Sequence, residues 1–581
     1  MAHYESLWVL KVLLFSIFCT IAICVPTASK QGLREEIRQL EKNPDQWNIY
    51  LLGLRRLQNI TQSDKLSYYQ IAGIHGRPYI AWDGVQGDPK GGGGYCQHGS
   101  NIFPTWHRPY LALFEEVLYL NTRQAISEFP SGKLKDRYNN ALSTFRMPYW
   151  DWAAVPPAGQ GSFPLSVQRP TVDVVLHNGT STIANPLFSY RFHPIPVSDF
   201  APGAWSTWPS TMRDPSSYDE NAASRNDIVA RDLEGIRVNL QSRVYNLLAL
   251  QHDYFNISND QRPGENIESI HDTIHNFVGS GGHMMDPAYA AFDPVFWLHH
   301  ANVDRLVAIW QALNPNSYVT PNSNPYATFT TPINSIADAN TPLHPFHKDD
   351  SGNFWTSETI RAHTIFGYTY PELLGLINST SAVVSTVNSL YGPNAMPPSK
   401  RSLDARAIAG APSFTGERQY IASVKVRKFG LDGSFNVYVF LGDGAPDAMP
   451  RTWAEDASFI GVTGMFAQTG SVATEMAQQE ANGEVPLTAA LEAKVRSGEL
   501  QSLEEDVVAA YLRANLKWKI SKTDGQVISI DDALGFQISV LWTEIQPAQS
   551  VNEFPTMKGD YQVLVGATDG RTGGFQSGDI L

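Results

Sequence analysis

The stretch Phe292–Leu306, FDPVFWLHHANVDRL, places two adjacent histidines inside a run whose apolar spacing predicts a helix. On that helix His300 shares a face with the apolar residues Val303 and Val307, whereas His299 lies on a mixed face. Because neighbouring helical residues point about 100° apart, only one of the two histidines can face a given metal ion. We predict that His300 is that ligand and that His299 either lies behind the ligands or lines the pocket.

A second histidine pair lies upstream, in the segment ESIHDTIHNFV (residues 268–278). His271 and His275 are four residues apart, so a helix places them one turn apart on one face, where both can bind one ion. This spacing alone is a weak signal, since many surface histidines match it. Together with His300 it predicts a three-histidine metal site. Three neutral imidazoles suit copper or zinc and leave a coordination position open.

A further set of histidines lies nearer the N-terminus, and only its last member is on a clearly helical segment. These residues are His75 in GIHGRPYIAWDG, His98 in YCQHGS and His107 in PTWHRPYL. We predict that they form a second three-histidine site. The spacing does not choose between copper and zinc.

Several segments resemble the tyrosinase family, most closely its fungal members, whose relatives include catechol oxidases and hemocyanins. The segments are FPTWHRPYLALFE, MPYWDW, ESIHDTIHNFVG, GGHM, FDPVFWLHHANVDRL and FGYTYPE, within about residues 40–375. The resemblance implies two copper ions in a four-helix bundle and dioxygen as co-substrate. It implies that copper A is bound by His75, His98 and His107, and copper B by His271, His275 and His300.

The resemblance also implies a covalent link at Cys96. Fungal tyrosinases carry a Cys-x-His motif whose sulfur is bonded to a ring carbon of the copper A histidine, and Cys96 and His98 match it. A thioether would fix the imidazole and remove a free thiol from an oxidising site. The alternative is an unmodified buried cysteine that acts as a small apolar residue.

Three residues next to the ligands are candidates for supporting roles. Phe296 matches a family aromatic that packs against the copper B histidines. Glu268 matches a family glutamate which, with an asparagine, holds a water proposed to deprotonate phenols. Here that asparagine is replaced by Asp272, which only accepts hydrogen bonds when ionised, so the water's orientation is in doubt.

Other polar residues of this region are assigned structural roles. His283 in GGHM is expected to be structural and not a ligand. Asp304 and Arg305 are expected to form a buried charged network behind the site.

The expected fold is mainly α, a four-helix-bundle dicopper core with long loops, followed by a β-rich (α+β) C-terminal domain. Helices are predicted at residues 34–59, 106–126, 265–278 and 294–313, with Pro109 in the first turn of the second. In the C-terminal region, strands are predicted at residues 419–429, 434–442, 517–523, 536–545 and 560–568, and helix at 486–516.

We divide the chain into a signal peptide (1–29), a catalytic domain (30–385), a linker (386–412) and a C-terminal domain (413–581). The linker holds Lys400-Arg401, a candidate processing site with cleavage after Arg401. No histidine follows His363, so the C-terminal domain cannot supply histidine ligands. We expect it to cover the site and keep the enzyme latent; the alternative is a permanent structural domain. The aromatic residues that could fill the substrate position are Phe435, Tyr438, Phe440 and Phe466.

The N-terminal residues predict secretion. Val12–Val25 is apolar, follows Lys11 and precedes small residues, as in a signal peptide, although a signal anchor is the alternative. Cys19 and Cys24 lie inside this segment, so its removal leaves Cys96 without a disulfide partner. The N-glycosylation sequons are Asn59, Asn178, Asn256 and Asn378.

Composition and net charge indicate which classes of binding partner the chain is suited to. Of 581 residues, 43% are hydrophobic and 17% charged, which is typical of globular domains, and the length predicts more than one. The net charge of -14 argues against nucleic acid and against stable association with anionic membranes. The sequence does not indicate an oligomeric state.

The resulting hypothesis is a copper-dependent tyrosinase that hydroxylates monophenols and oxidises o-diphenols to o-quinones, in pigment or secondary-metabolite formation. Three alternatives stay open. One is a catechol oxidase without hydroxylase activity. Another is a specialised tyrosinase-like enzyme of secondary metabolism, such as a cyclopenase, with zinc as the possible metal. The last is a hemocyanin-like oxygen carrier.

Overall fold

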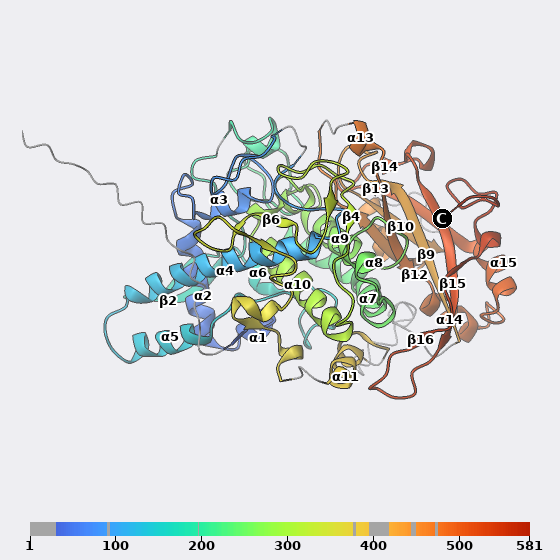
Figure 1. The fold of residues 1–581 in the computed structure, drawn as a ribbon, viewed down its shortest axis with the longest axis horizontal. Coiled ribbons are helices and arrows are strands. Elements are labelled where there is room, and N and C mark those ends of the chain that lie inside the picture. Colours follow the sequence, from blue (N-terminus) through green and yellow to red (C-terminus); the bar gives the residue numbers. More distant parts are fainter. Residues whose placement is uncertain are drawn as a thin grey trace, which may run out of the picture.

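The computed structural model describes residues 31–89, 93–195, 197–375, 379–393, 395, 417–442, 449–470 and 474–580. The predicted signal peptide and the Lys400-Arg401 pair lie outside the described residues. The helical region up to residue 393 forms one side of the molecule, and the β-rich C-terminal region packs against it (Figure 1). The expected order of a mainly helical region followed by a β-rich one is therefore confirmed.

Four helices carry or lead into the histidine-bearing segments. They are α3 (Tyr68–Gly73), α4 (Phe103–Ser127), α9 (Ile267–Gly279) and α10 (Val295–Leu313). Helix α10 contacts both α4 and α9. Every residue of α9 is buried, which is expected of a helix at the centre of a domain and not at its surface.

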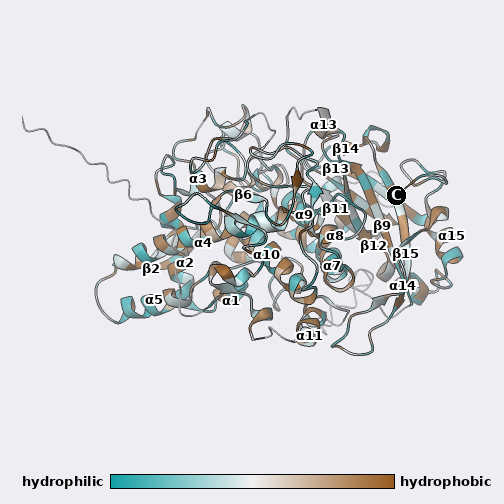
Figure 2. Cartoon of the chain, in the orientation of Figure 1, coloured by the Kyte–Doolittle hydropathy of each residue, from teal (hydrophilic) through white to brown (hydrophobic). Residues whose placement is uncertain are grey.

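Further helices surround this centre. Helix α2 (Pro44–Gln58) packs on α4, α7 (Asn226–Leu250) packs on α9 and α10, and α11 (Thr380–Tyr391) packs on α7 and α10. Helix α7 is 25 residues long and was not predicted. The helices show brown and teal segments together in Figure 2, as expected for elements that bury one face.

Two expectations about the helices were wrong in detail. The helix predicted at residues 34–59 is divided into α1 (Ile37–Leu40) and α2. Asn43 caps α2 by accepting the N–H of Gln46, and Pro44 is its first residue, because proline cannot continue a preceding helix. Helix α4 begins at Phe103, so Pro109 lies inside it and not in its first turn.

Short elements complete the helical region. Its other helices are α5 (Lys133–Thr144), α6 (Leu165–Gln168) and α8 (Tyr254–Ser258). Its two-stranded sheets pair β1 (Gly32–Leu33) with β8 (Tyr368–Thr369), β2 (Thr171–Leu176) with β3 (Gly179–Ala184), β4 (Asn322–Ser323) with β5 (Ile336–Ala337), and β6 (Pro342–His347) with β7 (Phe354–Thr356). The β1–β8 pair joins the two ends of the region.

Within its described residues, the C-terminal region contains two antiparallel sheets. The first sheet has the strand order β11 (Phe459–Met465), β10 (Phe435–Leu441), β13 (Leu516–Lys522), β14 (Val527–Ile528). The second sheet has the strand order β12 (Glu480–Pro486), β9 (Arg418–Arg427), β15 (Gln537–Gln546), β16 (Thr556–Met557). Strand β17 (Gln562–Val563) also pairs with β15. Its helices are α13 (Thr474–Ala477), α14 (Thr488–Ser497) and α15 (Glu505–Asn515). Strands β11 and β12 were not predicted. The strand predicted at 560–568 is only β17 followed by a 3-10 turn at Val565–Ala567.

Strand β10 connects the two regions through its alternating side chains. Phe435, Val437 and Val439 are buried in the core between the two sheets, while Tyr438 and Phe440 pack into the core of the helical region. Strand β11 passes directly over α9. A Cβ atom at Gly464 would lie 2.8 Å from Cα of Thr273, so only glycine permits this approach.

Candidate metal centre and its cover

The structure brings the predicted histidines together as two adjacent groups. One group is His75, His98 and His107 with Cys96; the other is His271, His275, His299 and His300. Within each group, one potential ligand atom per residue lies within 4.8 Å of all the others. The rings of His107 and His300, one from each group, are stacked with centroids 4.3 Å apart. The two groups therefore face each other across one buried site.

In the first group, backbone carbonyls orient two imidazoles. Nδ1 of His75 donates to the carbonyl of Pro287 at 3.0 Å, and Nδ1 of His107 donates to the carbonyl of Phe103 at 2.8 Å. Nε2 of His75 is buried and has no hydrogen-bond partner among the described residues. Such a carbonyl-held ring with its other nitrogen free is the usual arrangement of a metal-binding histidine.

In the second group, the Nε2 atoms of three histidines converge. Nε2 of His300 lies 3.3 Å from Nε2 of His271 and 3.2 Å from Nε2 of His275. Two nitrogens bound to one ion at about 2.0–2.1 Å with tetrahedral angles lie about 3.3 Å apart. Nδ1 of His275 donates to the carbonyl of Met284 at 2.6 Å, and Nδ1 of His271 contacts Asp272 at 2.9 Å. The arrangement of these three rings fits a metal ion.

The electrostatics of the site also suit metal binding. Burial is the main cause that lowers the pKa of every histidine in both groups, and nearby histidines lower most of them further. The pKa of His75 falls to about 4 and that of His299 to about 3. The imidazoles are therefore neutral at physiological pH, and a neutral ring has the lone pair that a metal ion needs.

His299 and Phe296 lie beside the ligand candidates, as predicted. The His299 ring stacks on His271 with centroids 5.0 Å apart, and neither ring nitrogen has a hydrogen-bond partner among the described residues. The Phe296 ring lies 4.1 Å from His300 and 4.9 Å from His75. Phe296 thus packs against both groups, not only the second.

Cys96 lies between two histidines of the first group. Its sulfur is 3.4 Å from Nε2 of His98 and 3.3 Å from Nε2 of His107, and the residue is 8% exposed. Burial raises the pKa of the thiol. The sequence paired Cys96 with His98 alone, and its contact with His107 is a further finding.

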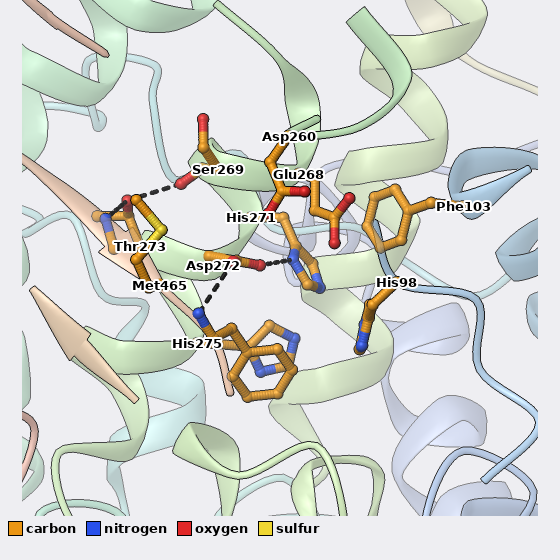
Figure 3. Close-up of polar contacts among 12 residues, drawn as sticks. His98, Phe103, Asp260, Glu268, Ser269, His271, Asp272, Thr273, His275 and Met465 are labelled. Carbon is orange, nitrogen blue, oxygen red and sulfur yellow. Dashed lines mark hydrogen bonds and ion pairs between the residues drawn. The ribbon is translucent and has the colours of Figure 1, made fainter. Parts of the chain in front are cut away.

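Two carboxylates next to the second group are bound on several sides. The N–H of Gly99 donates to both carboxylate oxygens of Glu268, at 2.7 and 3.0 Å. Asp272 contacts His271 through one oxygen and accepts the N–H of Phe466 at 2.9 Å through the other. Figure 3 shows Asp272 with its contact to His271. Glu268 lies on the other side of His271, next to Asp260 (Figure 3).

The C-terminal region contributes a lysine that the sequence analysis missed. Lys428 follows β9 and its ammonium lies 2.7 Å from Asp260, 3.1 Å from Glu268 and 3.1 Å from Asp272. All four side chains are at most 1% exposed. The signal available in the sequence was only a lysine at the end of an alternating strand, which normally indicates solvent exposure.

Of the four aromatic candidates in the C-terminal region, only Phe466 contacts the histidines. Its ring stacks on His275, with centroids 4.1 Å apart and planes inclined by 17°, and lies 5.5 Å from His98 and 5.7 Å from His271. Phe435 is buried in the core of its own region, and Tyr438 and Phe440 pack around Trp453.

The charged residues of α10 belong to two networks and not to one, which corrects the expectation. Burial alone would raise the pKa of Asp304. The positive charges of Arg108 and Arg34 outweigh this effect of burial and lower the pKa to about 2. The ion pairs are Arg108–Asp304 at 2.7 Å and Arg34–Asp304 at 3.4 Å, and separately Arg305–Asp151 at 3.0 Å and Arg305–Glu372 at 2.7 Å. Tyr368 and Tyr370 donate to Asp304, so the YTYPE segment is anchored to α10.

The remaining predicted residues lie away from the centre. His283 is buried, accepts the N–H of Met212 and belongs to neither histidine group. Asn59 and Asn178 are exposed, and Asn256 is half-buried. Asn378 and Arg401 lie outside the described residues.

Known protein families match both regions of the chain. The common central domain of tyrosinase matches residues 65–313, and the tyrosinase C-terminal domain matches residues 419–540. The chain belongs to the tyrosinase family and is an oxidoreductase.

Fungal relatives align over most of their length. The chain is 34% identical to a tyrosinase of Neurospora crassa, covering 97% of this chain and 99% of the relative. It is 35% identical to a tyrosinase of Podospora anserina, covering 85% of this chain and 97% of the relative. A structure of latent and active mushroom tyrosinase is 25% identical, with a TM-score of 0.76 over 92% of this chain and 97% of that one. A protyrosinase of Aspergillus oryzae, 21% identical with a TM-score of 0.71, shares the fold.

Within the described ranges, no helix is long and apolar enough to cross a membrane.

Proposed function

We propose that the chain is a copper-dependent phenol oxidase that hydroxylates monophenols and oxidises o-diphenols to o-quinones, serving pigment or secondary-metabolite formation. In the second reaction two diphenols each lose two electrons and two protons, and these reduce one dioxygen to two waters. The observation that carries the proposal is the pair of facing histidine groups, whose neutral rings fit two metal ions. Membership of the tyrosinase family favours copper for both.

The proposed ligands are His75, His98 and His107 for copper A and His271, His275 and His300 for copper B. The proposed four-helix bundle consists of α3, α4, α9 and α10. Copper supplies the binding of dioxygen and the redox chemistry. The chain holds the imidazoles in one tautomer through the carbonyls of Pro287, Phe103 and Met284, and excludes water from the site.

Glu268 and Asp272 are proposed to hold a water that takes the phenolic proton, as the resemblance to relatives implies for Glu268. Both residues lie on α9 next to the second histidine group, and Asp272 contacts His271 directly. The contact of Asp272 with Nδ1 of His271 fixes the orientation of its carboxylate.

The product pattern tests this assignment. We expect the copper-loaded chain, after its linker is cut, to convert catechol to o-quinone and tyrosine to a diphenol and then a quinone. Metal analysis should give two copper ions per chain. Oxidation of catechol without any product from tyrosine would show the catechol oxidase alternative. Copper binding with no oxidation of tyrosine, catechol or 2-aminophenol would contradict the proposal.

We also propose that the C-terminal domain (413–581) keeps the enzyme latent until the linker (386–412) is cut after Arg401. Phe466 on His275 supports this, because a substrate ring at copper B would need the same space. A tethered domain stays bound at an effective concentration of roughly millimolar, and cleavage removes that advantage.

The proposal also includes secretion of the protein. Residues 1–29 are proposed to be a signal peptide, and Asn59, Asn178, Asn256 and Asn378 to be glycosylation sites. Sequencing the N-terminus of the protein exported by its native host should place the first residue near Lys30, and retention of Met1 would contradict the signal peptide.

A thioether between Cys96 and His98 is the next prediction. The thiol and a ring C–H lose two hydrogens, a carbon–sulfur bond forms, and dioxygen accepts the two electrons. After copper loading and exposure to air, the denatured protein should not react at Cys96 with thiol reagents. The peptide spanning residues 96–98 should be lighter by two hydrogens.

Protein kept free of copper is the control for this prediction, and its Cys96 should be alkylated fully. Equal, quantitative alkylation of Cys96 in copper-loaded protein after turnover would contradict the cross-link.

A further inference from the structure

The cation at the edge of the site comes from the C-terminal region, whereas the three anions come from the catalytic region. Among the described residues, the only ion pair of Asp260 and of Glu268 is with Lys428. The other oxygen of Asp260, Oδ1, is buried without a hydrogen-bond partner. Three carboxylates thus surround one ammonium, and they hold more hydrogen-bond acceptors than that ammonium uses.

The same region also covers this cluster. The N–H of Asn482, in β12, donates to the carbonyl of Asp260 at 2.8 Å, and its side-chain amide donates to the same oxygen at 3.0 Å. Departure of the C-terminal domain would uncover Asp260 and remove Lys428 together. Three neighbouring carboxylates repel one another once Lys428 is gone, so the uncovered cluster favours another cation.

Lys428 and Phe466 contact one carboxylate oxygen. Oδ2 of Asp272 accepts the N–H of Phe466 at 2.9 Å and lies 3.1 Å from the ammonium of Lys428. Both side chains line a cavity of about 50 Å³ with His75 and His98. The C-terminal domain therefore presents an aromatic ring against His275 and an ammonium group nearby, the two groups that an arylalkylamine combines in one molecule.

We propose that Asp260, Glu268 and Asp272 form an ammonium subsite in the uncovered enzyme, which therefore prefers phenols with an alkylammonium side chain over neutral and acidic phenols. This rests on the proposed function, in which the phenol ring takes the place of Phe466. Hydrogen bonds from an ammonium to carboxylates are stronger than those between neutral groups, whereas a substrate carboxylate would be repelled.

Three catechols that differ mainly in side-chain charge test the subsite. They are dopamine (cationic), 4-ethylcatechol (neutral) and dihydrocaffeic acid (anionic), used with the copper-loaded chain after its linker is cut. We expect kcat/KM for dopamine to exceed that for 4-ethylcatechol by about tenfold or more, and the acid to be the poorest substrate. The difference should come mainly from KM and should shrink as salt is added, since salt screens charges.

Asp260→Asn should reduce the dopamine to 4-ethylcatechol ratio toward one, and Asp260→Glu should retain most of it, since it restores the charge. Asp286→Asn is the matched control. Asp286 is a buried carboxylate that also contacts the C-terminal region, through Thr469, but lies outside the cluster. This variant should keep the high ratio. Copper content, measured for each variant, separates loss of the subsite from loss of folding.

The outcomes distinguish the subsite from the proposed function. A ratio near one in the cut wild-type chain, or a high ratio that survives Asp260→Asn, would overturn the ammonium subsite while leaving the oxidase activity established. Failure to oxidise any of the three catechols would instead overturn the proposed function, and the subsite with it.

Discussion

His275→Ala is expected to abolish diphenol oxidation and to reduce bound copper below two ions per chain. Nε2 of His275 lies 3.2 Å from Nε2 of His300, and its other nitrogen is held by the carbonyl of Met284, so alanine removes one converging ligand nitrogen. Two histidines hold a copper ion more weakly than three. Copper content by atomic spectroscopy and oxygen uptake with catechol measure the two effects.

The control for this prediction is His252→Ala, because His252 is exposed and contacts Asn314 away from both histidine groups. It should bind copper and oxidise catechol as the unchanged chain does. Circular dichroism should show that both variants are folded. If His275→Ala bound two copper ions and retained full oxidase activity, His275 would not be a ligand.

Local periodicity explains why the sequence could predict which of the helical histidines share a face. The four-residue spacing of His271 and His275 and the apolar face of His300 are properties of single helices, and α9 and α10 place these residues as expected. His75 and His98 lie on loops, where no periodicity exists. They were grouped with His107 without support from periodicity, the resemblance to tyrosinases implied their role as copper A ligands, and the structure brings them beside His107.

The cover of the site could not be predicted, because it depends on contacts between residues far apart in the chain. Phe435 and Phe466 are both aromatic residues on or next to strands, yet β10 turns Phe435 into its own core and β11 ends where Phe466 meets His275. Lys428 carries no signal of burial in the sequence, since a lysine in an alternating strand is usually solvated. Its burial is explained by three carboxylates, of which Asp260 lies 168 residues away.

The same long-range contacts explain why intact and cut chains should differ in the charge beside the histidine site as well as in the access of substrate to it. Lys428 neutralises carboxylates that flank His271, so the intact chain presents a blocked and partly neutralised site. Removal of the C-terminal domain would free the space at His275 and the negative charge beside His271 in one step.

Cutting the linker after Arg401 is expected to raise diphenol oxidation by roughly 10²-fold or more, in line with the advantage that tethering gives a bound group. Phe466 stacks on His275 at 4.1 Å, and the backbone N–H of the same residue is held by Asp272, so the ring is fixed over the second histidine group. Phe466→Ala in the uncut chain should therefore raise activity partly, because it opens the ring's space while the rest of the domain still covers the site.

The matched control is Phe536→Ala, because Phe536 is a half-buried aromatic of the same domain that packs on the domain's own core. It should leave the uncut chain latent. Oxygen uptake with 4-ethylcatechol, before and after digestion with a protease specific for paired basic residues, measures all of these chains. A cut chain that binds two copper ions but is no more active than the intact one would show that the C-terminal domain is a permanent structural part. An increase for Phe536→Ala equal to that for Phe466→Ala would mean that general loosening of the domain, and not the ring over His275, controls access.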